Sequence, residues 1–547
     1  MIARSAAVAA GTIAAIEREL ADVPRLLATL PRRISDIPAL RAARDPAAAA
    51  LREGARAWSY GELTEAIERC ATDLAAAGVR GGDRVLIVGE NCAAFVAVLL
   101  GTARLDAWAV PVNARLSARE IDAIRDHCTP RRIVYLAHVS PDAAAHAARH
   151  GATEVWVPAA MGRVLLGGRN DDCEPELVSE DSAVQVAALL YTSGTTGDPK
   201  GVMLTHRNLL YIARLLSALR MLVECDCIYG VLPISHVYGL ASVCLGTLFA
   251  GACVHLEPRY SPQALLRALA QDRITVLQGV PSMYAKLLDF MRSTRAPLEA
   301  PRLRLCYAGG SPLTAALKTE VERAFGAPLH NGYGLTEASP TIAHTRLDAP
   351  RDDCSVGMLL PGLEMRIVEL ADPRHGDAPE GGSGELWVRG PNVMRGYYRD
   401  SVQTRQTIDA QGWLKTGDIA RRDADGALFI VGRTKELIIH SGFNVYPVEV
   451  ESVLNAHPAV SQSAVVGRSV EGNEEVVAFV ELSPGASATP EDIGRFAAER
   501  LAPYKRPAEI VILPVLPTAA TGKILKHRLR TLAARSTAEV DAEHPLR

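Results

Sequence analysis

The chain has 547 residues, of which 48% are hydrophobic and 22% are charged, and its formal net charge is -3. This length predicts two or three structural units, and the composition is that of a globular protein rather than a disordered or fibrous one. The nearly balanced charge argues against a nucleic-acid-binding protein. No apolar stretch reaches the roughly 18 uninterrupted residues of a membrane span, since Arg104 and Asp106 break the longest one, at 95–110.

The cysteines and the N-terminus indicate the compartment. Ten cysteines are scattered along the chain, without the density of a secreted disulfide scaffold or the paired spacing of a zinc site. The alanine-rich segment 6–16 is similar to the core of a signal peptide, but charged residues follow directly at 17–19 and favour an amphipathic helix. The sequence therefore predicts a cytoplasmic protein.

Short apolar runs alternate with helical patterns through the first two thirds of the chain. We predict a mostly apolar helix at 93–105 and strands, each followed by a loop and a helix, at 84–88, 184–191, 274–278 and 303–307. Such alternation predicts stacked α/β layers with mainly parallel pairing. Ligands of these sheets bind beyond the carboxyl ends of the strands, so the loops after Tyr191 and Tyr307 are the expected places for chemistry.

The pattern changes after Val356. Two segments alternate in the manner of antiparallel strands, and Asp425-Gly426 marks a hairpin turn. The predicted strands of this β unit are 363–369, 384–389 and 427–431. A smaller α/β unit follows, with predicted helices at 448–454 and 491–501 and predicted strands at 463–466, 476–481 and 509–513.

These elements predict an α/β multidomain protein. A large N-terminal domain of α/β layers with an added β unit is expected at 1–432, and a small mobile α/β lid at 433–535. Residues 536–547 are expected to form a flexible tail.

The strongest functional signal is the segment Tyr191-Thr-Ser-Gly-Thr-Thr-Gly-Asp-Pro-Lys-Gly201. Glycines let the backbone approach an anion, hydroxyl groups donate hydrogen bonds to phosphate oxygens, and a lysine adds positive charge. It is not a Walker loop, because Lys200 follows Pro199 and no Ser or Thr comes next. A flexible surface loop is the alternative interpretation, which the preceding strand disfavours. The candidate phosphate-binding residues are Thr192, Ser193, Gly194, Thr195, Thr196, Gly197 and Lys200.

This segment resembles the phosphate loop of the adenylate-forming superfamily, which comprises acyl-CoA synthetases, peptide-synthetase adenylation domains and firefly-type luciferases. Asn331-Gly-Tyr-Gly-Leu-Thr-Glu337 is similar to the family's second nucleotide motif. The resemblance implies that Tyr333 stacks beside adenine, Thr336 meets the α-phosphate and Glu337 helps to bind Mg²⁺. A carboxylate beside phosphates needs such a bridging cation. The candidate nucleotide-binding residues of this motif are Asn331, Gly332, Tyr333, Gly334 and Thr336.

Further matches lie before and after this motif. The segment with Gly309, Gly310 and Ser311 resembles the wall against the adenine ring, and it also fits a helix start capped by Ser311 with Pro312 in the first turn. Asp418 resembles the carboxylate that accepts hydrogen bonds from both ribose hydroxyls. The resemblance further implies that Arg433 contacts ribose or phosphate and that Lys435 is the hinge about which the lid rotates.

Lys523 resembles the family's C-terminal lysine, which reaches the carboxylate and the α-phosphate during adenylation. A cation aimed at charge that develops on phosphorus stabilises the transition state selectively. The segment 517–523 departs from the family's usual pattern at Thr518 and Ala519, while Gly522-Lys523 keeps its spacing.

The segment 438–449 resembles that of acyl-CoA synthetases, and its residues Ser441, Gly442 and Asn444 are expected to line a tunnel for CoA. His236 and Val237 match the segment that carries the family's gate or pocket residue, although a lone histidine among apolar residues is often structural. Gly279 belongs to another expected pocket wall, whose apolar character suits a fatty or aryl acid, with Lys286 as a conceivable partner of a second carboxylate.

The resemblance implies an AMP-forming acyl-CoA ligase that uses ATP, Mg²⁺ and CoA on a small carboxylic acid. One alternative is an acyl-AMP ligase that loads a separate carrier protein. Another is a nucleotide-binding protein that has lost its chemistry, which the presence of Lys200, Glu337 and Lys523 disfavours. The oligomeric state is open, with a homodimer as one option.

Overall fold

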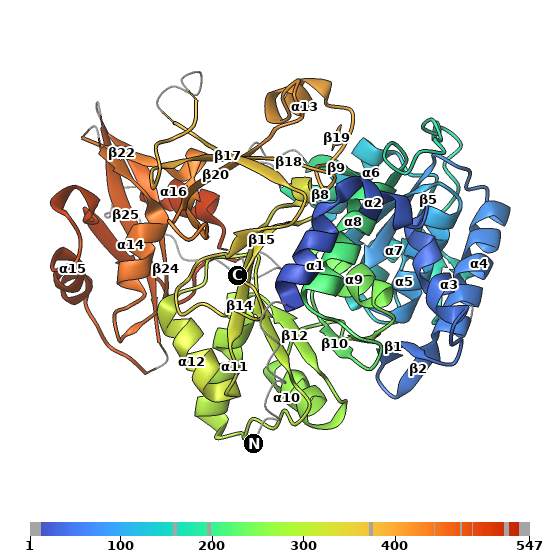
Figure 1. Ribbon diagram of the computed structural model, residues 1–547, viewed down its shortest axis with the longest axis horizontal. Coiled ribbons are helices and arrows are strands. Elements are labelled where there is room, and N and C mark those ends of the chain that lie inside the picture. Colours follow the sequence, from blue (N-terminus) through green and yellow to red (C-terminus); the bar gives the residue numbers. More distant parts are fainter. Residues whose placement is uncertain are drawn as a thin grey trace.

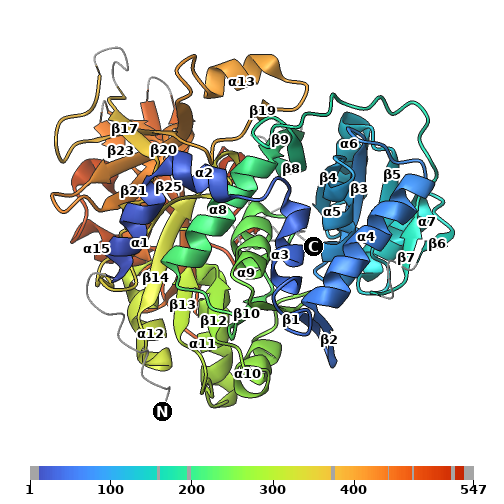
Figure 2. The same cartoon turned by 45° about the vertical axis from the view of Figure 1, so that its right-hand side comes forward.

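A computed structural model describes residues 12–156, 161–193, 199–370, 376–441, 443–470, 473–483, 485–518 and 524–534. Two large sheets form its N-terminal part, a smaller antiparallel sheet follows, and a compact α/β unit formed by the C-terminal segment lies to one side (Figures 1 and 2). This arrangement confirms the predicted fold class.

The first sheet has the strand order β19-β9-β8-β4-β3-β5-β7-β6. Its central strands pair in parallel, and antiparallel strands flank them. The strands are β3 (Arg84–Gly89), β4 (Trp108–Asn113), β5 (Arg132–Tyr135), β6 (Glu154–Trp156), β7 (Val164–Leu166), β8 (Val186–Ser193), β9 (Pro199–Thr205) and β19 (Gly396–Tyr397). Helices α6 (Ala118–Cys128) and α7 (Pro141–Arg149) pack on this sheet in a shared hydrophobic cluster.

The second sheet has the order β16-β15-β14-β13-β12-β10-β11-β1-β2. Its strands are β1 (Ala49–Glu53), β2 (Arg56–Ser59), β10 (Cys227–Gly230), β11 (Cys253–Leu256), β12 (Val276–Gly279), β13 (Leu305–Ala308), β14 (Leu329–Gly334), β15 (Thr341–His344) and β16 (Met358–Leu359). Three helices pack against the parallel strands β10 to β13: α10 (Pro262–Gln271), α11 (Pro281–Thr294) and α12 (Ala315–Phe325).

One core joins the two sheets. It contains residues of α4 (Tyr60–Ala76), α5 (Ala93–Arg104), α8 (His206–Leu219), the π-helix Tyr238–Leu245 and α9 (Gly246–Phe249). The remaining helices of this part are α1 (Thr12–Ala21), α2 (Val23–Thr29) and α3 (Ile37–Ala42). Helix α5 is buried from Ala93 to Ala103, which explains why it is apolar on every side, as expected from the sequence.

Two sequence predictions are wrong in this part. The chain does not run from the strand before Tyr191 through a loop into a helix; it returns first as β9, which pairs antiparallel with β8. Val202 and Leu204 are buried while Met203 between them is less so, an alternation that the Pro199–Gly201 turn signal concealed. Ser311 does not cap a helix either, because α12 begins at Ala315 and Thr314 caps it.

The smaller sheet has the order β17-β18-β20-β21 and confirms the predicted β unit. Its strands are β17 (Glu364–Val368), β18 (Ser383–Arg389), β20 (Leu414–Arg422) and β21 (Leu428–Arg433), with helix α13 (Ser401–Thr407) before β20.

The C-terminal unit confirms the predicted elements after Arg433. They are β22 (Ile438–His440), β23 (Phe443–Val445), α14 (Pro447–Leu454), β24 (Val460–Val470), β25 (Asn473–Leu482), α15 (Pro490–Ala498), β26 (Glu509–Ile512) and α16 (Lys526–Ala533). Helices α14 and α15 cover one face of its sheet, and α16 packs in a separate cluster. Across all described helices, none is both long and apolar enough to cross a membrane.

Candidate active site

The two ends of the predicted phosphate loop lie on the paired strands β8 and β9. Thr192 and Ser193 end β8, and Lys200 stands opposite Thr192 on β9. The predicted residues between them, Gly194, Thr195, Thr196 and Gly197, lie outside the described residues. This pairing places Thr192 and Lys200 side by side at the same end of the two strands.

Lys200 is held by Tyr397 and Gln403, which come 197 and 203 positions later in the sequence. Its ammonium group donates a hydrogen bond to Gln403 Oε1 over 3.0 Å and lies 5.6 Å from the ring centroid of Tyr397. Tyr397 reaches this place because β19 pairs antiparallel with β9.

Glu337 contacts the same tyrosine at its hydroxyl group. The hydroxyl group of Tyr397 donates to Glu337 Oε1 over 2.8 Å, and Tyr397 is only 8% exposed. The pKa of Tyr397 is raised mainly by burial and, to a smaller extent, by the Glu337 carboxylate. The hydroxyl group therefore stays protonated and acts as a donor. Tyr397 therefore contacts both residues, with its ring near the Lys200 ammonium group and its hydroxyl group on the Glu337 carboxylate.

Asp418, on β20, is 3% exposed and has both carboxylate oxygens engaged. Arg433 Nε lies 2.9 Å from Oδ1, from the facing position of β21, and the Tyr333 hydroxyl group donates to Oδ2 over 2.5 Å. Burial and the neighbouring Asp418 raise the pKa of Tyr333 well above its usual range, while Asp418 raises that of Arg433. The structure thus joins three predicted nucleotide-binding residues in one group.

The other residues of the second nucleotide motif lie at the end of β14. Thr336 begins a short 3₁₀ turn that also holds Glu337. Gly332 and Gly334 occupy crowded backbone, because a Cβ on Gly334 would lie 2.1 Å from Pro340 O. The Asn331 amide is engaged in the fold, since it donates to Ser355 O over 3.1 Å and accepts from the amide of Gly332.

The candidate acid pocket lies at the ends of β12 and β13. Gly279 ends β12, and Gly309, Gly310 and Ser311 follow β13. His236 is exposed, and its Nδ1 accepts a hydrogen bond from the backbone amide of Tyr238 over 3.2 Å, which assigns the proton of the neutral ring to Nε2. Val237 is buried beside it. Lys286 is exposed on α11 rather than buried with the pocket residues.

The predicted CoA and hinge residues lie in the C-terminal unit. Ser441 and Asn444 are exposed on the β22–β23 hairpin, and the Ser441 amide donates to Asn473 Oδ1 over 2.6 Å. Gly442 and Lys523 lie outside the described residues. Lys435 belongs to a 3₁₀ turn directly after β21, and its carbonyl accepts a hydrogen bond from Arg530 of α16 over 3.0 Å.

Helix α16 is also tied to this turn through a lysine. Lys526 Nζ lies 2.9 Å from a Glu436 oxygen and 2.8 Å from a Glu451 oxygen. Burial disfavours the ammonium form, but the two carboxylates outweigh it and raise the pKa of Lys526. The segment that leads away from Lys523 is therefore anchored to the turn that contains Lys435.

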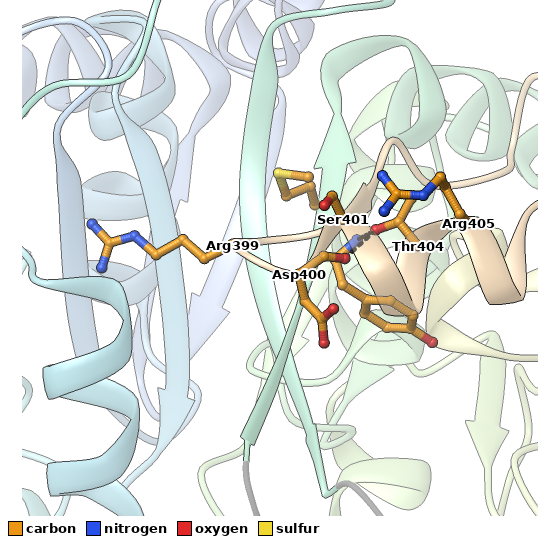
Figure 3. Close-up of a pocket in the computed structure, with 7 residues that line it drawn as sticks. Arg399, Asp400, Ser401, Thr404 and Arg405 are labelled. Atoms are coloured by element: carbon orange, nitrogen blue, oxygen red, sulfur yellow. Dashed lines mark hydrogen bonds between the residues drawn. The ribbon is translucent and has the colours of Figure 1, made fainter.

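A surface hollow of about 530 Å³ opens beside Tyr397 (Figure 3). Arg399 extends away from the other lining residues toward α6, where it donates to His127 O over 2.9 Å. The Thr404 hydroxyl oxygen accepts from the Tyr397 backbone amide over 2.9 Å, so α13 supports the tyrosine backbone. The hollow is lined by Met203, Tyr397, Arg399, Asp400, Ser401, Thr404 and Arg405.

Sequence reasoning missed three residues near these groups: Tyr397, Gln403 and Arg220. Tyr397 and Gln403 lie in a stretch with no nucleotide-like pattern, and only the pairing of β19 with β9 brings them to Lys200. Arg220 follows α8 and reads as an ordinary surface residue near a helix end, but it is 1% exposed. No local signal in the sequence indicates any of these contacts.

Comparison with known proteins places the chain among enzymes. Residues 39–398 match the model of the AMP-binding enzyme family, and residues 449–523 match that of the AMP-binding enzyme C-terminal domain. The chain is 36% identical over 504 residues to a feruloyl-CoA synthase of Amycolatopsis sp, covering 90% of this chain and 97% of the relative. It is 35% identical to an indoleacetate–CoA ligase of Aromatoleum aromaticum, over 90% of this chain and 96% of that one.

Solved structures of related enzymes superpose on most of this chain. ATP-bound MatB from Rhodopseudomonas palustris is 31% identical and superposes with a TM-score of 0.80, covering 91% of this chain and 99% of that one. The TM-score against apo MatB is 0.71, so this chain superposes better on the ATP-bound structure. MenE from Bacillus subtilis in complex with ATP and magnesium is 30% identical, with a TM-score of 0.76 over 90% of this chain and 99% of that one. The chain therefore belongs to the AMP-binding enzyme family, in its acyl-CoA ligase branch.

Proposed function

We propose that this AMP-forming CoA ligase activates an aromatic carboxylic acid. In the reaction of these ligases an oxygen of the acid attacks the α-phosphorus of ATP and pyrophosphate leaves; the CoA thiol then attacks the acyl carbon of the acyl-AMP, and AMP leaves. The relatives named for feruloyl-CoA and indoleacetate support an aromatic acid. So do the rings of Tyr238 and Tyr307, which lie against Gly309 and Gly332 at the end of the second sheet.

The observation that carries the adenylation step of this proposal is the grouping of four ionisable residues from distant segments. Lys200 and Glu337 contact the same tyrosine, Asp418 binds Arg433, and Tyr333 joins Asp418 to the segment that holds Glu337. We assign Lys200 to the β- and γ-phosphates and the departing pyrophosphate, Asp418 to the ribose hydroxyls, and Arg433 to ribose or phosphate.

Glu337 fits a magnesium ligand. Its oxygen atoms suit a hard cation, and only Oε1 is occupied, by Tyr397, among the described contacts. The described residues contain no group of three or more His, Cys, Asp or Glu side chains that would hold a metal by themselves. Phosphate oxygens and water would therefore complete the coordination, as is usual for Mg²⁺. When bound, the ion neutralises and orients the phosphates.

Tyr397→Phe is expected to raise the half-saturating Mg²⁺ concentration about tenfold, because the hydroxyl group that orients Glu337 is lost. The ring beside Lys200 stays, so activity should recover at high Mg²⁺. The measurement is the initial rate over a magnesium titration at fixed ATP. Tyr398→Phe is the matched control, since the Tyr398 hydroxyl group donates to Glu176 instead. Identical Mg²⁺ dependence of the two variants would contradict the role.

The acceptor distinguishes this function from its alternative, the loading of a separate carrier protein. The enzyme is incubated with ATP and an aryl acid, and either CoA or a phosphopantetheine-bearing carrier protein is added. We expect acyl-CoA and stoichiometric AMP with CoA, and no acylated carrier. Acyl-AMP that ignores CoA and transfers only to the carrier would establish the alternative.

We further propose that residues 1–432 and 433–535 form two domains with Lys435 as the hinge. β21 ends at Arg433, and the 3₁₀ turn with Lys435 follows at once. Rotation there would bring either Lys523 or the hairpin with Ser441, Gly442 and Asn444 to the active site, one for each half-reaction. The contacts of α16 with the turn support this, because they couple the lysine segment to the hinge.

A further inference from the structure

Arg220 is a buried cation that has no counterion among the described residues. Its side chain is 1% exposed, and Nη1 donates to Ser242 Oγ over 2.5 Å and to Gln278 Oε1 over 2.6 Å. Its guanidinium carbon lies 4.3 Å from the ring centroid of Tyr307. None of the described carboxylates forms an ion pair with it. Buried charges in proteins are normally paired, so this arrangement requires an explanation.

The groups around Arg220 add hydrogen-bond donors that have no partner. The buried atoms without a partner include Arg220 Nε, Gln278 Nε2 and the hydroxyl groups of Tyr238 and Tyr307. Ser242 does not supply a partner for these donors, because its hydroxyl group donates to Gln278 Oε1. Unsatisfied buried donors are rare in native proteins. A carboxylate is the group that fits best, since it only accepts hydrogen bonds and carries the missing negative charge.

The titratable groups His330, His344 and Tyr307 beside Arg220 do not neutralise its charge. Burial lowers the pKa of His344 to about 3 and that of His330 to about 4, so both rings are neutral near pH 7. Burial also raises the pKa of Tyr307, although Arg220 opposes the shift, so this hydroxyl group remains a donor.

The cluster is adjacent in sequence to the candidate acid-pocket residues at the ends of β12 and β13. Three neighbouring strands, β12, β13 and β14, carry Gln278, Tyr307 and His330 at paired positions. The next paired positions are Gly279, Ala308 and Asn331, where the pocket wall and the nucleotide motifs begin. A Cβ on Gly332 would lie 2.2 Å from the Tyr307 hydroxyl oxygen. Tyr238 belongs to the π-helix that begins directly after Val237, and π-helical segments are frequent at functional sites.

We propose that the acid carries a second carboxylate, at the end distant from the reacting one, and that this group binds Arg220. This inference rests on the proposed function, because it assumes that the acid enters past His236 with its reacting carboxylate toward the nucleotide. The buried cation takes the place that the sequence had suggested for Lys286, which is exposed.

The test compares acids of matched length and shape that end in a carboxylate, a hydroxyl group or a methyl group, for instance cinnamic acids substituted at the ring position opposite the side chain. Acid-dependent exchange of labelled pyrophosphate into ATP gives kcat/KM for each. The diacid should exceed the methyl-ended acid about tenfold or more, because a site built for a polar group rejects an analogue that lacks it. Arg220→Met should remove this preference without lowering the rate with the methyl-ended acid.

Two further variants keep the test decisive if Arg220→Met is unstable. Tyr307→Phe retains the ring beside Arg220 and removes one donor, so it should weaken the diacid selectively. Arg84→Met is the control for loss of a buried arginine: Arg84 is 0% exposed and donates to backbone carbonyls outside the acid pocket, including Cys128 O at the end of α6. The Arg84→Met variant should have a lower thermal unfolding temperature but should rank the acids by kcat/KM as the wild type does.

A wild-type preference for the hydroxyl- or methyl-ended acid would overturn the inference and leave the proposed function intact. The inference is also overturned, and the proposed function left intact, if folded Arg220→Met and Tyr307→Phe both rank the acids by kcat/KM as the wild type does. Arg220 would then be a purely structural cation held by the Tyr307 ring. Absence of exchange with every acid would overturn the proposed function and this inference together.

Discussion

Asp418→Ala should raise the KM for ATP by roughly 10²–10⁴, because it removes an ionised acceptor from two hydrogen bonds of about 1.5–3 kcal/mol each. Asp418 is 3% exposed and holds Tyr333 and Arg433 at the same time. Without it, Arg433 loses its charged partner and Tyr333 loses the acceptor that fixes its ring. The ribose loses its acceptor as well, so binding and positioning of ATP fail together.

The measurement is acid-dependent pyrophosphate exchange over an ATP titration, with thermal unfolding as a check on folding. Asp423→Ala is the matched control: Asp423 is a partly exposed carboxylate of the same sheet region and pairs only with Arg421 among the described ion pairs. A surface pair of this kind contributes about 0–1 kcal/mol, so this variant should behave like the wild type. An unchanged KM for ATP in folded Asp418→Ala would refute the assigned role.

Lys523→Ala should lower the rate of adenylation by about 10²–10³, the effect of removing one donor that stabilises transition-state charge. The thioester step should persist, because CoA attack on acyl-AMP does not need a cation at the α-phosphate in the proposed mechanism. Pyrophosphate exchange measures the first half-reaction, and acyl-CoA formation from supplied acyl-AMP measures the second. Equal loss in both would show that Lys523 serves the fold of the lid rather than adenylation.

The sequence was sufficient for the elements that depend on local patterns. The buried strand at Arg84, the apolar helix α5 and the strands of the C-terminal unit follow from periodicity, and the structure confirms them. β9 was missed, because Pro199 and Gly201 are typical turn residues and hid an alternating strand of four further residues. Its pairing with β8 is a tertiary preference that overrides local propensity.

The candidate site also contains residues that the sequence identifies and residues that only the fold reveals. Lys200, Glu337, Asp418 and Arg433 are recognisable because each lies in a motif, and the structure brings them near one another. Tyr397 and Arg220 have no such context, and their partners lie 60 and 58 positions away in the chain, at Glu337 and Gln278. Contacts over such separations are fixed by strand order and packing, which a single sequence does not reveal.

The central claim is that this chain joins a carboxylic acid to AMP. Its most direct test is the exchange of labelled pyrophosphate into ATP by the purified protein, with and without a broad panel of aryl and aliphatic acids. We expect exchange that requires both an acid and Mg²⁺, and that stops in the Asp418→Ala variant. Exchange that proceeds equally without any acid, or no exchange with any acid of the panel, would contradict the account.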